Sequence, residues 1–294
     1  MFGFELWFVL AVAAAVVGGF GNFGNKISAK RGYDSAVIMI FSAFLSSLIF
    51  LPFALFFEDI WSLPLSFVAI MLGAGFITSF SAIIKIQALH YIDSAIFLPL
   101  YKVASPLVVI FFGMIFFAET FTPMEWFGLM LSLTVPLLLV SRMEHSRQND
   151  LKLGLILVLV AGVIGAIGAA IQKYSTDVSD ATLSIMVVIT SGVLLGSVAQ
   201  HIFYKKSQSM QVISSHLKSG PLFVSSLRAV FAGSGFYLAL LALDYDGPLG
   251  IVYTINSLYI LVPIILAIII YGEHWNFRKA LAIVLSVLAL ALLQ

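Results

Sequence analysis

Ten segments of this chain are long enough and apolar enough to cross a lipid bilayer as helices. About 20 apolar residues span the hydrocarbon core as a helix, whereas an open strand there would leave backbone groups unpaired. The sequence therefore predicts an all-α integral membrane protein with ten transmembrane helices. The expected helices cover residues 4–25, 34–57, 65–87, 93–117, 125–141, 152–173, 180–204, 220–243, 247–271 and 276–293.

Composition supports a lipid environment and excludes several functions. Hydrophobic residues make up 61% of the chain and charged residues only 10%, against roughly 25% charged in soluble domains. The net charge of +1 gives no reason to expect a nucleic-acid partner, and the absence of cysteine excludes thiol catalysis and thiolate metal sites. The first segment has an acidic Glu5 and no basic residue, so we expect a retained helix rather than a cleaved signal.

No sequence motif points to an enzyme. The chain has no HExxH zinc motif, no GxSxG nucleophile motif, no phosphate-binding GxxxxGKS loop and no acidic or histidine cluster at metal spacing. We therefore expect no catalytic residues, no bound metal and no cofactor.

The basic residues are distributed unevenly between the two faces of the predicted bundle. Most of the 15 lysines and arginines fall in the loops that follow helices 1, 3, 5, 7 and 9, whereas the opposite face has only Lys173. The positive-inside rule then places these basic loops in the cytoplasm and both termini outside. The short loops are typical of a prokaryotic inner-membrane protein, although a eukaryotic organelle is not excluded.

The chain also contains an internal repeat of about 150 residues. Gly18–Ser28 resembles Gly165–Ser175, and ALHY from Ala88 resembles ALDY from Ala242. Five helices per copy is an odd number, so the second copy enters the membrane from the opposite side. The sequence predicts two inverted five-helix repeats, residues 1–146 and 147–294.

These repeated motifs resemble a known family. A glycine-rich first helix that ends in Asn-Lys or Gln-Lys, with an Ala-Glu or Gly-Glu turn before helices 5 and 10, is similar to the drug/metabolite transporter superfamily. The closer resemblance is to its ten-helix EamA-like members, over nearly the whole chain. It implies transport of small metabolites by alternating access, without enzyme activity or a cofactor. Many such members keep both termini in the cytoplasm, and the charge distribution here predicts the reverse.

Two cations lie deep inside predicted helices. Lys102 is about 13 Å into helix 4 and Arg228 about 12 Å into helix 8. A charge at this depth costs about 2.5–3.5 kcal/mol, and no Asp or Glu is predicted at that depth to offset it. Either both side chains reach back toward the cytoplasmic face, or one or both line a watery cavity and bind an anionic group of a substrate.

Polar residues near these cations favour the cavity hypothesis. Lys102 and Asn256 occupy equivalent places in the two repeats, which is where a site on a pseudo-twofold axis would lie. Hydrogen bonding between helices is the alternative role for the asparagines, and simple packing for the tyrosines. The predicted substrate-binding residues are Lys102, Arg228, Asn256, Tyr253, Tyr259, Tyr101, Asn22 and Asn25. The predicted hinge or close-packing residues are Gly18, Gly21, Gly165, Gly168, Pro99, Pro106 and Pro263.

Several other polar residues have simpler interpretations. We expect Glu119 and Glu273 to cap the helices that follow them, with proton transfer as the alternative. Lys26 and Lys173 are expected to snorkel at helix ends. Gln172 is also placed at a helix end, where polarity carries little information.

Together these features predict a secondary transporter of a small polar metabolite that bears an anionic group. Its pathway would lie between the repeats, along helices 1, 3, 4, 6, 8 and 9. Membrane lipid would surround it, a coupling ion or proton would drive it, and it would act as a monomer or homodimer. The alternatives are a broad exporter of drugs or amino acids, a membrane subunit that transports nothing, and a lipid-carrier flippase.

Overall fold

The computed structural model describes residues 5–31, 33, 35–91, 94–139, 151–204, 219–272 and 275–294. Over these residues the chain is all-α, and the predicted ten-helix fold is confirmed, with the ninth segment built from three short pieces. The first five segments are α1 (Leu6–Arg31), α2 (Ser35–Phe57), α3 (Leu65–Tyr91), α4 (Ser94–Phe116) and α5 (Pro123–Leu138), with a 3-10 turn η1 (Ile60–Ser62) after α2. The last five are α6 (Leu151–Val178), α7 (Thr182–Tyr204), α9 (Ser219–Asp244), α10 (Leu249–Ser257) continued by η2 (Leu258–Ile260) and α11 (Leu261–Tyr271), and α12 (Phe277–Leu292).

The outer surface of the bundle is apolar, as a lipid-facing surface must be. Phe56 is 89% exposed, and Ile115, Phe116 and Phe127 are also exposed. A soluble protein would not present so much large apolar surface to water. Within the described residues, six helices are long and apolar enough to cross a membrane, and three shorter apolar helices accompany them. The chain is therefore an integral membrane protein.

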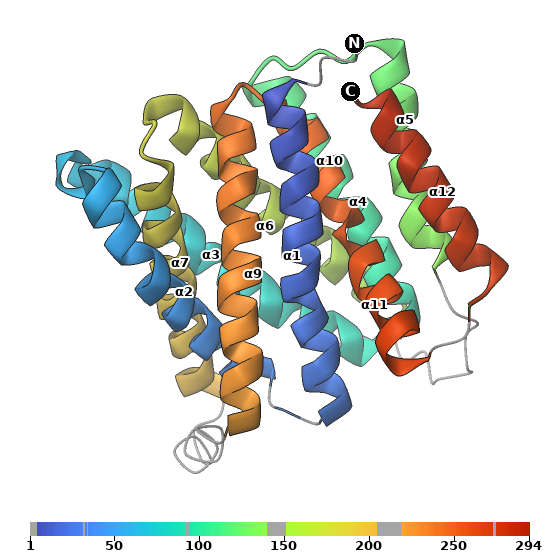
Figure 1. Ribbon diagram of the computed structural model, residues 1–294, viewed down its shortest axis with the longest axis horizontal. Helices are drawn as coiled ribbons and strands as arrows, with labels where there is room; N and C mark the ends of the chain where they lie inside the picture. Colours follow the sequence, from blue (N-terminus) through green and yellow to red (C-terminus); the bar gives the residue numbers. More distant parts are fainter. Residues whose placement is uncertain are drawn as a thin grey trace.

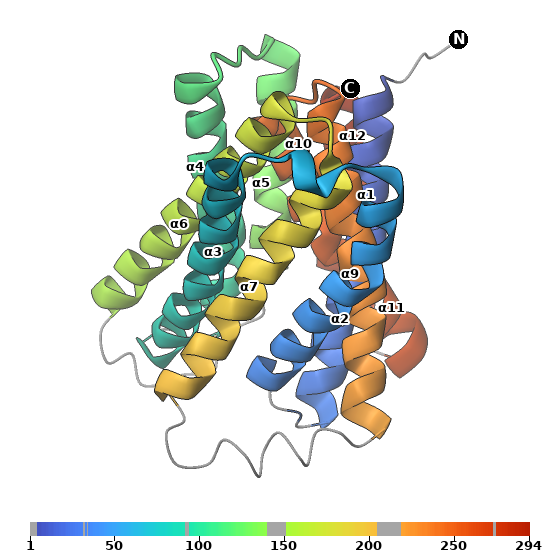
Figure 2. The same ribbon diagram turned by 90° about the vertical axis from the view of Figure 1, so that its left-hand side faces the viewer.

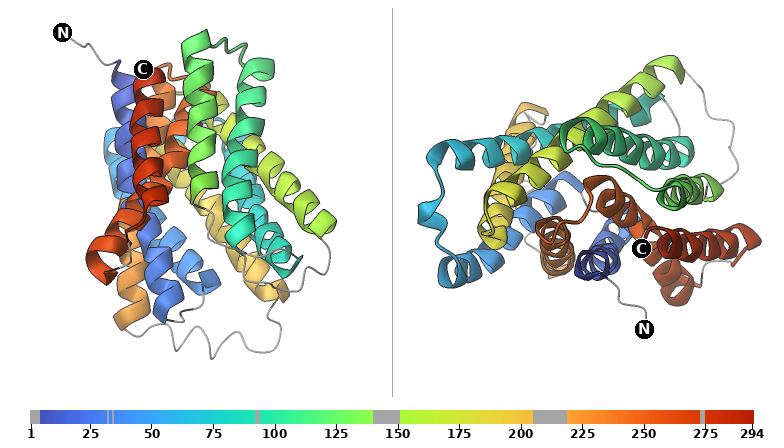
Figure 3. Two further views of the ribbon diagram at one scale, coloured as in Figure 1. Left: turned by 90° about the vertical axis from the view of Figure 1, so that its right-hand side faces the viewer. Right: turned by 90° about the horizontal axis from the view of Figure 1, so that it is seen from above.

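Both ends of the fold lie on the same side of the bundle. In Figure 1, α1 begins and α12 ends at the upper end. α2 and α7 pack together at one edge, and α5 packs against α12 at the other (Figures 1 and 3). Between these edges lie α1, α9, α6 and α4, with α10 beside α1 and α4. This arrangement brings helices from both halves of the chain together at the centre.

Helices at equivalent positions in the two predicted repeats make equivalent contacts. α1 packs against α9, and the equivalent pair α6 and α3 also pack together. α2 contacts α9 as α7 contacts α3, and α4 contacts α6 as α10 and α11 contact α1. α1 runs downward in Figure 1, whereas α6 runs upward in Figure 2. These pairings support the two-repeat organisation, whose boundaries at 1–146 and 147–294 stay a prediction.

Glycines permit the closest helix approaches. A Cβ on Gly21 of α1 would lie 2.4 Å from the backbone nitrogen of Ala232 in α9. A Cβ on Gly75 of α3 would lie 2.1 Å from the carbonyl oxygen of Ile189 in α7. Real side chains do not come this near to backbone atoms, so these helices can approach this closely because both positions are glycine.

Two helices extend five or more residues further than the sequence indicated. The prediction ended helix 1 at residue 25 and helix 6 at residue 173, but α1 continues to Arg31 and α6 to Val178. Polar side chains in these extensions bond within their own helices. The Ser28 hydroxyl donates to the Gly24 carbonyl, and the Ser175 hydroxyl donates to the Ile171 carbonyl. The polar residues that marked a loop are therefore compatible with helix.

The ninth segment is not one continuous helix, as the prediction had it. The 3-10 turn η2 at Leu258–Ile260 separates α10 from α11. Pro263 explains the interruption, because its ring excludes the carbonyl of Tyr259 from the normal helical hydrogen bond. A 3-10 stretch inside a helix often marks a functional hinge. Here the 3-10 turn contains Tyr259, which lines a cavity at the centre of the bundle.

Candidate functional site

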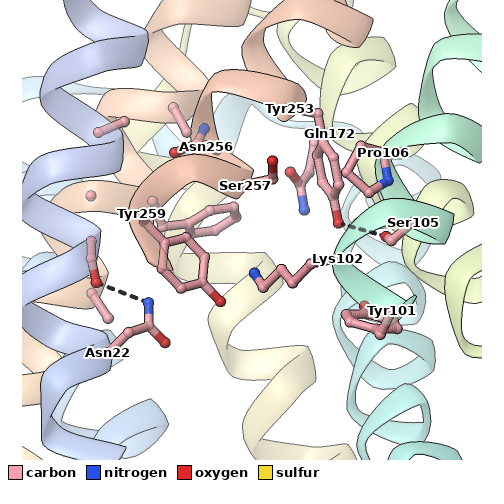
Figure 4. A pocket seen from close by; sticks show the side chains of 16 residues that line it. Asn22, Tyr101, Lys102, Ser105, Pro106, Gln172, Tyr253, Asn256, Ser257 and Tyr259 are labelled. Carbon is pink, nitrogen blue, oxygen red and sulfur yellow. Dashed lines mark hydrogen bonds between the residues drawn. The ribbon is translucent and has the colours of Figure 1, made fainter. Parts of the chain in front are cut away.

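A cavity of about 350 Å³ lies in the middle of the bundle, and we call it the central cavity. Helices α1, α4, α6, α9 and α10 and the η2 turn contribute its walls, so both halves of the chain take part (Figure 4). Among the described residues that line it there is one basic side chain and no acidic one. The polar lining residues are Asn22, Tyr101, Lys102, Ser105, Gln172, Tyr253, Asn256, Ser257 and Tyr259.

Lys102 is the charged residue of this cavity. Its Nζ lies 3.8 Å from the centroid of the Tyr259 ring, a cation–π contact worth about 0.5–2 kcal/mol. No ion pair joins Lys102 to a carboxylate in the described part of the chain. In Figure 4 the side chain extends from α4 toward Tyr259 across the cavity. The ammonium is thus held by a ring face but keeps an unneutralised charge.

Hydroxyl groups surround the other side of the cavity. The Ser105 hydroxyl lies 3.4 Å from the Tyr253 hydroxyl, which links α4 to α10 (Figure 4). Gly165 of α6 leaves room for this cluster, since a Cβ there would lie 3.3 Å from Ser105 Oγ and 3.4 Å from the Tyr101 hydroxyl. These groups can donate or accept hydrogen bonds, so they suit a polar ligand beside the Lys102 charge.

Asn22 and Asn25 form a hydrogen-bonded series along α1. The Asn22 side chain donates to the Gly18 carbonyl at 2.9 Å, and the Asn25 amide donates to Asn22 Oδ1 at 3.2 Å. Arg228 Nη1 in turn donates to Asn25 Oδ1. Asn22 therefore lines the central cavity, while Asn25 holds the guanidinium of Arg228.

Arg228 itself does not line the central cavity. It lines an adjoining space of about 260 Å³ between α2, α3, α6, α7 and α9, which we call the side cavity. The two cavities share Gln172, Ala232 and Phe236. The structure thus gathers six of the eight predicted substrate residues around the central cavity and separates Arg228 and Asn25 from them. Their role in substrate binding stays a prediction.

The predicted hinge and packing residues are dispersed around these cavities. Gly18 and Pro106 line the central cavity, and Gly168 packs where a Cβ would lie 2.4 Å from the Thr78 side chain. Pro263 follows the η2 turn. Pro99 belongs to α4, but its side chain lies outside the described residues, as does Glu273. Whether any of these residues acts as a hinge stays a prediction.

Sequence reasoning missed Gln172, which lines both cavities. It was assigned to a helix end, but α6 continues to Val178, so Gln172 lies inside the bundle. The internal repeat could have pointed to Gln172. Gln172 is the counterpart of Asn25, a residue already selected for its polarity inside a helix.

Glu119 caps a helix other than the expected one. Its carboxylate accepts hydrogen bonds from the backbone amides of Leu249 and Gly250, at the start of α10. The following helix, α5, has its own capping box made by Thr122 and Glu125. The prediction that Glu119 caps α5 was therefore wrong. Thr122 and Glu125 already cap α5, and Glu119 instead caps α10 in the second half of the chain.

Burial raises the pKa of the Glu119 carboxyl. The amides of Gly250 and Leu249 and the charge of Lys173 oppose this effect, and the charge of Asp177 adds to it. A second carboxylate makes a similar link, because Glu58 accepts from the amides of Leu183 and Ser184 at the start of α7. Two acidic residues of the first half thus cap two helices of the second half.

Lys173 is buried rather than snorkelling, which corrects the expectation from sequence. Its side chain is 10% exposed, and its Nζ donates to the Leu243 carbonyl at 3.0 Å and pairs with Asp177 at 3.0 Å. The reason is that α6 extends one turn beyond Lys173 and supplies Asp177 at the (i, i+4) position. The ammonium therefore has partners inside the fold and does not need to reach solvent.

The chain is similar to a family of known proteins and to a solved structure. Residues 5–141 match the EamA-like transporter family. A solved structure described only as a crystal structure of a protein is similar with a TM-score of 0.77 at 13% identity, over 97% of this chain and 95% of that one. At this identity the likeness concerns the fold alone. No curated protein sequence matches the chain.

Proposed function

Residues 5–141 of this chain match the EamA-like transporter family, a family of membrane transporters and not of enzymes, and from this match we propose that the chain is a transporter, what it transports and where the substrate binds. The substrate is a small polar metabolite that carries an anionic group. It binds in the central cavity, and its anionic group contacts Lys102. No cofactor takes part, and transport proceeds by alternating access.

The observation that supports this proposal is the uncompensated charge of Lys102. A lysine at this depth is costly, and such residues are usually paired or mark a substrate pathway. Lys102 lines a cavity with no described carboxylate and has a tyrosine ring as its neighbour. A carboxylate or phosphate of the substrate would supply the missing negative charge.

The hydroxyl and amide groups around Lys102 would select a polar substrate. Tyr253, Asn256 and Tyr101 can orient the uncharged part of the molecule, and Asn22 lies across the cavity from Tyr101. Because these residues come from both predicted repeats, rocking of one repeat against the other would open the cavity to each side in turn. The predicted inverted repeats, residues 1–146 and 147–294, are the two moving parts in this mechanism.

The orientation that we propose follows from the basic residues. Arg31 ends α1 at the lower end of Figure 1, and Lys152 lies in the first turn of α6, which starts at the lower end of Figure 2. Arg278 and Lys279 lie in the first turn of α12, at the end of that helix away from the C-terminus. The positive-inside rule places this end in the cytoplasm and both termini outside, as in a prokaryotic inner membrane. A coupling ion or proton and a monomeric or homodimeric assembly belong to the same proposal.

Thermal stabilisation of the purified protein tests the proposal. A ligand that binds only the folded protein raises its apparent stability by mass action. We expect small carboxylates or phosphates to raise the melting temperature of the wild type and of Lys152→Gln, whose lysine is exposed on α6. We expect Lys102→Gln to lose the shift. Equal stabilisation of all three proteins by neutral or cationic compounds would instead favour a broad exporter.

One observation favours that second candidate. Tyr101, Tyr253, Tyr259 and Phe236 give the central cavity aromatic walls, which suit apolar or cationic compounds. In a broad exporter of this kind Lys102 would be a structural residue, and its replacement would leave binding intact.

A further inference from the structure

The side cavity contains buried polar atoms that have no hydrogen-bond partner in the described part of the protein. Ser46 is 5% exposed, and its hydroxyl has no hydrogen-bond partner among the described residues. The Nε atom of Arg228 is likewise buried and without a partner there. Both residues line the side cavity. An unsatisfied buried polar group costs about 1–3 kcal/mol, so these two atoms of the side cavity are candidates for contact with a bound ligand.

The other hydroxyls of this cavity already have partners. Ser42 donates to the Met39 carbonyl, Thr78 to the Ala74 carbonyl, and Thr190 to the Met186 carbonyl. This contrast separates Ser46 and Arg228 from the ordinary helix-bonded hydroxyls around them. It identifies a specific pair of donors rather than a generally polar wall.

The guanidinium of Arg228 is held in place from the other side. Nη1 donates to Asn25 Oδ1, and Asn25 is tied to Asn22 and through it to the α1 backbone. The Arg228 stem packs beside Gly24, where a Cβ would lie 2.7 Å from Arg228 Cγ. A fixed guanidinium with a free N–H is suited to a carboxylate or phosphate oxygen.

The side cavity adjoins the central cavity. Gln172, Ala232 and Phe236 line both, and no acidic residue lines either one among the described residues. Lys102 thus lies on one side of this shared wall and Arg228 on the other. Two cations without carboxylate partners among the described residues therefore occupy adjoining cavities.

We propose that the side cavity is a second anion subsite, and that the transported molecule carries two acidic groups. This inference rests on the proposed function and names the substrate class: a small dicarboxylate or a phosphorylated carboxylate. One acidic group contacts Lys102, the other contacts Arg228 and the Ser46 hydroxyl, and Gln172 faces the part between them. A molecule with a single acidic group fills only the central subsite.

The test compares diacids with their own monoesters on the full-length purified protein. Succinate, glutarate and adipate vary the spacing of the two charges, and each monomethyl ester removes one charge while keeping the carbon chain. We expect one diacid to bind wild type roughly tenfold more tightly than its monoester, as measured by thermal shift and calorimetry. Equal binding of every diacid and its monoester overturns the proposal and needs no variant.

Variants then locate the second group. Arg228→Gln is expected to lower diacid affinity to that of the monoester without changing monoester binding, and Ser46→Ala to weaken the diacid alone. Lys102→Gln is expected to weaken both ligands. If Arg228→Gln fails to fold, Ser46→Ala and the wild-type comparison still decide.

Different results would contradict the second subsite and the proposed function. Monoester binding that depends on Lys102, with no added effect of the second acid, contradicts the second subsite and leaves the proposed function standing. Absence of any anion binding, with no effect of Lys102→Gln, contradicts the proposed function itself.

Discussion

A lysine inside a bilayer is costly unless its charge is paired, and two lysines of this chain differ in their partners. Lys173 has a carbonyl and a carboxylate as partners, so its charge is used within the fold. Among the described residues, Lys102 contacts the face of the Tyr259 ring and pairs with no carboxylate, so its charge is available to a ligand. The same residue type is thus structural at one position and a candidate substrate contact at the other, and its partners distinguish the two roles.

Replacing Lys173 tests its structural role. Lys173→Met keeps most of the apolar stem but removes the donor, which leaves the Leu243 carbonyl and the Asp177 carboxylate without it. We expect a loss of about 1–3 kcal/mol in stability. Lys152→Met is the matched control, because Lys152 is exposed on the same helix. Equal thermal midpoints for both variants in detergent would refute the assignment.

Sequence reasoning identified Lys102, Tyr259 and Asn256 because polar residues deep in apolar helices are conspicuous. It misjudged Lys173 and Gln172 because both depend on where α6 ends, and polar residues inside a helix resemble a loop in sequence. It also had no means of separating Arg228 from Lys102, since their cavities are divided by side chains from distant helices.

At the scale of elements, close helix crossings hold the two halves together. A Cβ on Gly21 would collide with the backbone of α9, whereas a Cβ on Gly73 of α3 would meet nothing within 4 Å. We expect Gly21→Ala to destabilise the protein by about 1–3 kcal/mol, because the backbone of α9 must move. Gly73→Ala should be neutral or slightly stabilising. Thermal midpoints that rank the two variants the other way would contradict this packing.

The Glu119 cap links the end of α4 to the start of α10 and predicts a pH effect. Burial raises the pKa of this carboxyl, so the folded chain binds the proton more tightly than the unfolded chain. Its contribution to stability is therefore fully present below the ordinary pKa of glutamate and is lost as pH rises through the raised value.

Measuring the thermal midpoint across that window tests the effect. Wild type should lose stability as pH rises through it, and Glu119→Gln, which cannot titrate, should show a smaller decline. Glu125→Gln is the control, because Glu125 belongs to the α5 capping box and lies nearby in sequence. Identical pH profiles for wild type and Glu119→Gln would exclude Glu119 as the source.

For the whole molecule, the ten-helix architecture followed directly from the spacing of apolar segments, because each crossing needs a fixed length of helix. The interruption of the ninth segment by η2 was not predicted, although Pro263 was named as a hinge or close-packing residue. Interruptions of this kind depend on whether neighbouring helices satisfy the freed carbonyl, which no local pattern records.

The orientation of the molecule is directly testable, because the chain has no cysteine. Asp59, which follows α2, and Gln294, the last residue, are exposed and belong to the end of the bundle that we place outside; Lys152, in the first turn of α6, is exposed at the other end. We expect a membrane-impermeant maleimide to label Asp59→Cys and Gln294→Cys on intact cells, and Lys152→Cys only after permeabilisation. The reverse pattern would show that the termini are cytoplasmic.

If Lys102 binds an anionic substrate during transport, its charge must be needed for flux. We would measure flux of the most stabilising anion into liposomes that contain wild type, Lys152→Gln or Lys102→Gln. We expect equal flux for the first two and a loss of roughly tenfold or more for Lys102→Gln, since a charge-assisted contact contributes about 1.5–3 kcal/mol. Undiminished flux through Lys102→Gln would contradict it.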